Sequence, residues 1–201
     1  MKLDWSNQQL TRDKLAKKLK DLRQEEWLEF KELNLESNKL ESIDGIEFPD
    51  GLEKLLLFQN SLPSVDNVMF PGSLKELDLG CNRLTSIDKA KFPEGLEALY
   101  LYANNLTSLD NAIFPAGLQI LSIASNYLTS VINIKLPKGL KEFIAGGLPI
   151  ASSEKELYEK YMLEMAVCNN DNSSLQDSLS QEEIIEDMYA PFNDGSNLDL
   201  S

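Results

Sequence analysis

The sequence predicts an α/β solenoid, in which 22-residue repeats stack their short strands into one parallel sheet with a concave outer face. Three observations support this prediction. Leucines recur 22 residues apart through the middle of the chain, and an asparagine and a Phe-Pro pair recur with the same period. The repeats run without an insertion or deletion, and an amphipathic stretch flanks them at each end. We expect five full repeats and one partial repeat over residues 30–150.

The apolar columns of the repeat predict its core. With residue 30 counted as position 1, the columns are position 1 (Phe30, Leu52, Leu74, Leu96, Leu118, Leu140), position 4 (Leu33, Leu55, Leu77, Leu99, Leu121, Phe143), position 6 (Leu35, Leu57, Leu79, Leu101, Ile123), position 11 (Leu40, Leu62, Leu84, Leu106, Leu128) and position 14 (Ile43, Val65, Ile87, Leu109, Val131). Positions 4 and 6 alternate with variable residues, as a short half-buried strand requires.

Position 9 is asparagine in five repeats, at Asn38, Asn60, Asn82, Asn104 and Asn126. An amide side chain both donates and accepts, so a stacked column of asparagines can satisfy backbone groups where the chain leaves the strand. We therefore expect this column to be structural and not catalytic. Together the columns spell LxxLxLxxNxL, the signature of the leucine-rich repeat.

The second half of each repeat reads SIDxxxFPxG. The phenylalanines are expected to stack as an inner spine, and the prolines to keep the convex side extended or turn-like, without long helices. Glycine closes four of the repeats and is expected to provide the return into the next strand. One aspartate per repeat is a poor cage for a metal ion, so we expect these carboxylates to cap turns.

The two ends of the solenoid need covering, because a terminal repeat exposes core on its outer side. Residues 1–29 are predicted to form an N-terminal helical cap, with a capping box at Ser6-x-x-Gln9 and a helix over about residues 7–26. Residues 151–168 are predicted to form a C-terminal capping helix that opens at Ser153-x-x-Glu156. Residues 169–201 carry eight acidic residues and no lysine or arginine, and are expected to form an acidic tail.

Positions 3, 5 and 7 point away from the core and line the concave face of the sheet. We predict that this face binds a partner through Glu32, Asn34, Glu36, Lys54, Leu56, Phe58, Glu76, Asp78, Ala98, Tyr100, Tyr102, Ile120, Ser122, Glu142 and Ile144. The larger apolar residues are expected to be exposed together, namely Leu56, Phe58, Tyr100, Tyr102, Ile120 and Ile144. A charged rim on one side is expected from Glu32, Glu36, Glu76 and Asp78. The alternative is that a terminal tail or helix of the same chain covers this face.

Composition excludes several classes of function. The net charge of −14 argues against nucleic-acid binding, and no apolar run is long enough for a membrane span. The chain has no histidine, which removes histidine-based triads and histidine metal sites, so we expect no enzymatic activity, no catalytic residue, no metal and no cofactor. The two cysteines, Cys81 and Cys168, form no disulfide framework, and Cys81 has acidic neighbours that disfavour its thiolate.

The repeat LxxLxLxxNxLTSIDxxxFPxG, as in residues 74–95 and 96–117, resembles that of bacterial leucine-rich-repeat effectors, most of all those of the Legionella type IV secretion (Dot/Icm) system. The resemblance covers residues 30–150. The carboxylates of Glu182, Glu183, Glu186 and Asp187 in the tail are similar to the glutamate-rich export signal of such substrates. Related enterobacterial effectors carry a large C-terminal ubiquitin-ligase domain. Because only about 50 residues follow the last strand here, the resemblance does not imply that activity.

The resemblance implies a protein that is made in the bacterial cytoplasm and translocated into the host cell cytoplasm. We expect it to be a monomer before it captures a protein partner, either a host enzyme or another bacterial effector, on its concave face. Without a catalytic domain it would act by inhibiting or masking that partner. The alternative function is an adaptor that recruits ubiquitination or signalling machinery through its end helices.

Overall fold

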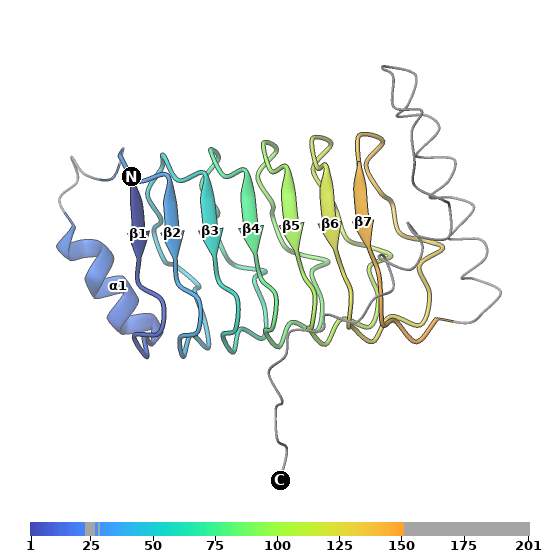
Figure 1. Cartoon of the computed structure of the whole chain (residues 1–201), viewed down its shortest axis with the longest axis horizontal. Coiled ribbons are helices and arrows are strands. Elements are labelled where there is room, and N and C mark those ends of the chain that lie inside the picture. The colour runs from blue at the N-terminus through green and yellow to red at the C-terminus, as the bar shows by residue number, and fades with distance from the viewer. Residues whose placement is uncertain (23–26, 28, 151–201) are drawn as a thin grey trace, which may run out of the picture.

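The computed structural model describes residues 1–22, 27 and 29–150 as a single stack of coils that share one parallel sheet (Figure 1). The seven strands follow chain order across the sheet and are β1 (Lys2–Asp4), β2 (Glu32–Asn34), β3 (Lys54–Leu56), β4 (Glu76–Asp78), β5 (Ala98–Tyr100), β6 (Ile120–Ser122) and β7 (Glu142–Ile144). One helix, α1 (Arg12–Asp21), lies at the β1 end. The predicted C-terminal capping helix (151–168) and acidic tail (169–201) lie outside the described residues.

Strand register confirms the 22-residue period. Leu33, Leu55, Leu77, Leu99, Leu121 and Phe143 stand opposite one another across successive strands from β2 to β7. Because each strand pairs with the strand one repeat later in the same register, every position of the repeat becomes a row that crosses the sheet. Core positions therefore stack on core positions, and surface positions on surface positions.

The core lies between this sheet and the convex side, and the predicted apolar columns fill it. Positions 4, 6 and 11 are almost wholly buried in all of these repeats. The structure adds a column at position 17 that sequence analysis did not identify, formed by Ile46, Val68, Ala90, Ala112 and Ile134, all buried. Each of these residues donates its backbone N–H to the carbonyl of position 14 in its own repeat, as Val68 does to Val65 at 3.2 Å. The column was not predicted because its residues vary between isoleucine, valine and alanine, so no single residue type recurs with the 22-residue period.

The asparagines of position 9 form a continuous hydrogen-bonded ladder between repeats. The Nδ2 of Asn82 donates to the carbonyl of Leu79 in its own repeat at 3.1 Å and to that of Leu57 in the preceding repeat at 3.0 Å. Its Oδ1 accepts the backbone N–H of Leu62 at 3.0 Å. Asn60, Asn104 and Asn126 make the same three contacts with their own neighbours. The ladder therefore satisfies buried backbone groups that the turn after each strand leaves unpaired.

The residue before each asparagine has a left-handed backbone. Ser37, Gln59, Cys81, Ala103 and Ser125 have φ between 50° and 54°, a region that non-glycine residues rarely adopt. The backbone N–H of Cys81 donates to the carbonyl of Tyr102 in the next repeat at 3.0 Å, and the same bond recurs along the column. Hydrogen bonds between repeats thus hold a turn that the local sequence alone would not favour.

The convex side is turn-like, as predicted, and contains no helix between residues 30 and 150. The turns are capped by serine and not by aspartate: the Ser64 hydroxyl accepts the backbone N–H of Asp66 at 3.0 Å, and three other repeats match it. Phe48 is buried, but Phe70, Phe92 and Phe114 are only half-buried. The phenylalanine spine therefore lies nearer the surface than predicted, because the position-17 column occupies the space beneath it.

The N-terminal segment differs from its prediction. Strand β1 pairs with β2 by placing Leu3 opposite Leu33, so the sheet begins one strand earlier than expected. Asn38 bonds this segment as it would a preceding repeat: its Nδ2 donates to the Trp5 carbonyl and its Oδ1 accepts the Leu10 N–H, both at 2.9 Å. Residues 3–10 therefore form half of a repeat. This half-repeat was not predicted because α1 lies between it and the first full repeat, so its residues do not fall on the 22-residue period.

The predicted start of the N-terminal helix was wrong. Ser6 is not the residue that precedes a helix, because its hydroxyl and backbone N–H both bond Asp4 in the turn after β1. The helix begins at Arg12, after Thr11, whose side chain makes no capping hydrogen bond. Leu15 and Leu19 of α1 are buried in the core, as an amphipathic helix that covers the end of the solenoid requires.

Replacing Asn82 by alanine should lower the free energy of unfolding by about 2–4 kcal/mol, because three carbonyls and one N–H in the core would lose a hydrogen bond. Lys75→Ala is the matched surface control, since it removes only the exposed ion pair with Glu97, and should stay within about 1 kcal/mol. Urea unfolding followed by circular dichroism measures both. Equal losses would contradict the assigned ladder.

Candidate functional site

The outward-facing rows of the sheet, positions 3, 5 and 7, form one surface that we call the sheet face. All fifteen predicted binding residues lie in these rows, but they are not equally accessible. Asn34, Ala98 and Ser122 are buried, Glu142 is exposed, and the others are half-buried. The larger apolar residues, which were expected to be exposed together, are therefore half-buried. Because neighbouring strands lie only about 4.8 Å apart, each large side chain of the sheet face covers part of the smaller side chains on the strands beside it.

The first row of the sheet face is largely neutralised by ion pairs between strands. Lys2 Nζ lies 2.9 Å from Glu32 Oε1, and Lys54 Nζ lies 2.7 Å from Glu76 Oε1. Two of the four residues expected to form an acidic rim thus already have cationic partners, which sequence analysis missed because it did not consider neighbouring strands together. Glu36, Asp78 and Glu142 have no ion-pair partner among the residues that the structure describes.

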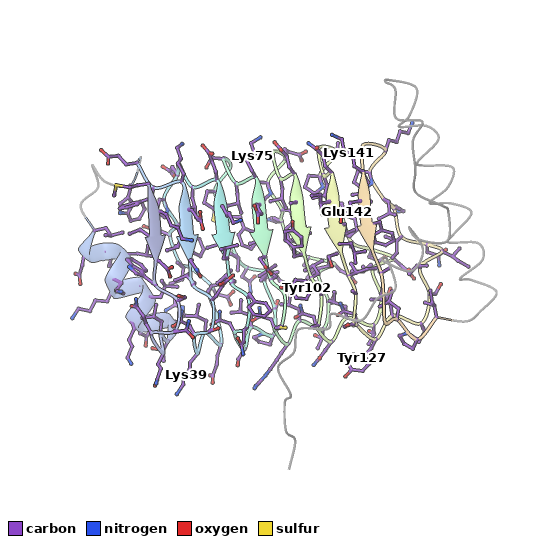
Figure 2. All side chains as sticks on the ribbon, in the orientation of Figure 1. Lys39, Lys75, Tyr102, Tyr127, Lys141 and Glu142 are labelled. Atoms are coloured by element: carbon purple, nitrogen blue, oxygen red, sulfur yellow. The ribbon has the colours of Figure 1, made fainter. Side chains whose placement is uncertain are left out.

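A second series of ion pairs follows the edge where the strands begin. Lys31 pairs with Glu53 and Lys75 with Glu97, each at 2.9 Å, and all four residues occupy position 2. Lys75 and Lys141 mark this edge in Figure 2, whereas Lys39 and Tyr127 mark the opposite one. The edge is therefore charged but balanced, and the uncompensated acidic groups lie further along the strands.

Two aromatic residues from non-adjacent strands meet on the sheet face. Tyr102 and Phe58 have ring centroids 5.9 Å apart, with the planes tilted by 30°. The intervening residue of their row is Gly80, and a β-carbon there would lie 2.6 Å from Cε1 and 2.8 Å from Cε2 of Tyr102. The absence of a side chain at residue 80 therefore lets the tyrosine ring lie across β4 toward Phe58. Figure 2 places Tyr102 midway along the sheet.

Asp78 lies beside this pair and is the most perturbed carboxylate of the described chain. Burial raises its pKa to about 6, and the nearby charges of Glu36 and Glu76 act in the same direction. Its Oδ1 accepts the Gly80 N–H at 2.8 Å, and it hydrogen-bonds Tyr102, both of which oppose the rise in pKa. Burial and the Asp78 carboxylate in turn raise the pKa of the Tyr102 phenol. We call Glu36, Phe58, Asp78, Gly80 and Tyr102 the central patch.

The Cys81 thiol also lies near the sheet face, and its environment disfavours the reactive thiolate. Burial raises the pKa of the Cys81 thiol, and the Asp78 carboxylate adds to this, so the thiolate is disfavoured as the sequence suggested. In the described part of the chain, no three metal-ligating side chains come together and no helix is long and apolar enough to cross a membrane. The features that sequence analysis missed are the ring stacking and the desolvation of Asp78. The one feature of the sequence that pointed to this arrangement was Gly80, at position 7 of the third repeat, where a larger residue could have been expected.

Replacing Asp78 by asparagine should stabilise the protein at neutral pH. The native pKa of about 6 exceeds the ordinary value of 3.8, so the native state binds more protons between those values and stability falls as pH rises through about 4 to 6. Asparagine stays neutral and can still accept the Gly80 N–H. We expect a gain of about 1–2 kcal/mol at pH 7.5 that vanishes below about pH 4, measured by thermal melting. A gain that does not depend on pH would contradict this assignment.

Comparison with known proteins supports the same architecture. The Leucine rich repeat family model matches residues 72–128, and a search of curated proteins found no match. Internalin C2 of Listeria monocytogenes is similar at 21% identity and a TM-score of 0.59, over 75% of this chain and 63% of that one. An internalin, InlF, from the same organism is similar at 21% identity and a TM-score of 0.51, over 70% and 50%.

The leucine-rich-repeat domain of a Shigella effector is similar at 20% identity and a TM-score of 0.47, over 69% of this chain and 67% of that one. The chain spans less than two thirds of the length of each internalin. The 22-residue register, the asparagine ladder and the family match identify one architecture. The chain has the leucine-rich repeat fold.

Proposed function

We propose that this protein is a binding module that holds a protein partner on its sheet face. The observation that carries the proposal is the central patch. There, two aromatic rings gather with two carboxylates that form no ion pair with any described residue, on a surface that points away from the core. Aromatic residues surrounded by polar groups are the usual anchors of protein interfaces.

The shape of the sheet face supports a macromolecular partner. Seven strands spaced about 4.8 Å apart span roughly 29 Å, which is the width of a small protein interface. The rows are regular, and the leucines that stabilise the solenoid all point to the other side of the sheet. The residues of the sheet face can therefore be chosen for a partner without loss of the fold.

The action on that partner is proposed to be inhibition or masking. Inhibition or masking requires only that a surface of the partner be occupied, and the aromatic anchors of the central patch support such an action. The alternative is an adaptor that joins two proteins. The two functions differ in stoichiometry: one stable binary complex supports inhibition or masking, whereas a ternary assembly supports recruitment.

We propose in addition that the protein is an effector delivered from a bacterium into host cytoplasm. The support for this proposal is the resemblance of residues 30–150 to bacterial effector repeats and the acidic composition of residues 169–201. The partner would then be a host protein or another bacterial effector. Affinity capture from host lysate and from bacterial lysate in parallel separates these two sources.

The aromatic residues of the central patch should carry the binding energy for the captured partner. Tyr102→Ala should reduce affinity at least tenfold, about 1.4 kcal/mol, because it removes a central anchor of the interface. Tyr127→Ala is the matched control, since Tyr127 is 61% exposed and lies at the far edge of the sheet. Calorimetric titration of both variants measures the difference. An equal affinity for the two would move the binding site off the sheet face.

The acidic tail should be needed for delivery and not for folding or binding. Removal of residues 178–201 should abolish translocation in a reporter assay, because it deletes the run of acidic residues that resembles an export signal. Thermal melting and partner affinity of the truncated protein serve as controls and should be unchanged. Delivery at the full level would refute the export role, and a markedly lower melting temperature would assign the tail to the fold instead.

A further inference from the structure

We propose that the partner inserts a lysine or arginine side chain against the carboxylates of Asp78 and Glu36, beside the paired rings of Phe58 and Tyr102. This inference rests on the proposed binding function and specifies the chemistry of the partner. It follows from which charges of the sheet face are compensated, from the position of the tyrosine ring, and from the environment of one carboxylate.

Ion pairs leave the sheet face with an excess of negative charge at its centre. The two lysines of the sheet face, on β1 and β3, already form ion pairs: Lys2 with Glu32 and Lys54 with Glu76. No lysine or arginine of the described chain lies within ion-pair distance of Asp78 or Glu36. The two carboxylates act on each other electrostatically, since the charge of Glu36 raises the pKa of Asp78. A cation is the group that this centre lacks.

The rings place a cation-binding surface next to these carboxylates. Tyr102 lies over Gly80 and packs against Phe58 with a centroid separation of 5.9 Å and a tilt of 30°, and it hydrogen-bonds Asp78, so the ring pair lies next to the acidic centre. Lysine and arginine are attracted to aromatic faces, and the long apolar stem of either side chain can pack on the rings while its charged end reaches a carboxylate. An apolar partner residue would use the rings but would bring no compensating charge to the two carboxylates.

The Asp78 carboxylate is unfavourable to the free protein. Burial raises its pKa to about 6, so its ionised form destabilises the fold at neutral pH. Groups that destabilise a fold in this way are concentrated at functional sites. A partner cation would favour the ionised form and convert this local instability into binding energy, which gives a physical reason for an aspartate at this position of β4.

Charge also argues against the chain's own tail as the occupant. Residues 169–201 contain eight acidic residues and no lysine or arginine, so they would be repelled by Asp78 and Glu36. A basic segment of another protein is the complementary occupant. If residues 169–201 did cover the sheet face, the truncated protein lacking them would bind a basic probe more tightly than the full chain.

The test is an NMR titration of the full chain with a defined probe, acetyl-Ala-Arg-Ala-Arg-Ala-amide, and with the same peptide carrying citrulline in place of arginine. Citrulline keeps the shape of the side chain and removes its charge. We expect the arginine peptide to shift the backbone amide signals of Gly80 and Tyr102 in a saturable way. The citrulline peptide should bind at least tenfold more weakly.

Two variants localise the effect. Asp78→Asn should weaken binding of the arginine peptide at least fivefold. Asp88→Asn removes one charge from an exposed convex residue and should change nothing, which controls for the overall acidity of the protein. Equal binding of the two peptides, shifts confined to other regions, an equal effect of the two variants, or tighter binding after removal of residues 169–201 would overturn the inference. A captured partner whose affinity still depends on Tyr102 would then leave the binding function standing with an uncharged anchor.

Discussion

The asparagine ladder is the interaction on which the rest of the structure depends. Each position-9 side chain joins two consecutive repeats by donating to a carbonyl in each and accepting an N–H from the earlier one. These bonds set the distance and the register between coils, and the left-handed residue that precedes each asparagine adds a backbone hydrogen bond to the next repeat. Without them, the turn after every strand would bury unpaired backbone groups, and no neighbouring element could supply replacements.

A fixed register divides the residues of each strand between two roles. In β4, Leu77 faces the core and stands opposite leucines of β3 and β5, whereas Asp78 faces outward. Because the same division repeats in every coil, rows on the outer face can combine residues that are far apart in the sequence. Phe58 and Tyr102 are 44 positions apart, yet their rings stack because one glycine lies between them in the row. The fold thereby accommodates a surface that includes the partly buried Asp78 carboxylate, although the ionised form of this group lowers the stability of the free protein.

Periodicity made the core, the strand register and the turn-like convex side predictable, since each depends on a residue type that recurs at one position. Features that depend on departures from the period could not be predicted in the same way. Residues 3–10 form half a repeat, but α1 shifts them out of phase, and the position-17 column varies between isoleucine, valine and alanine. The fifteen sheet-face positions were identified correctly as outward-facing. Their burial, their ion pairs and the desolvation of Asp78 arise between strands and not within a repeat.

The central claim is that the ladder holds the coils together as one cooperative unit. Native-state hydrogen exchange tests it at four backbone amides that donate to asparagine Oδ1, those of Leu40, Leu62, Leu84 and Leu106. These amides lie in buried turns outside the strands, and the asparagine Oδ1 is the acceptor that the structure gives to each of them. We expect them to exchange as slowly as the strand-flanking amides of Leu57 and Leu79, by global unfolding. Exchange at the rate of exposed turn amides would show that the ladder does not hold the coils together as one cooperative unit.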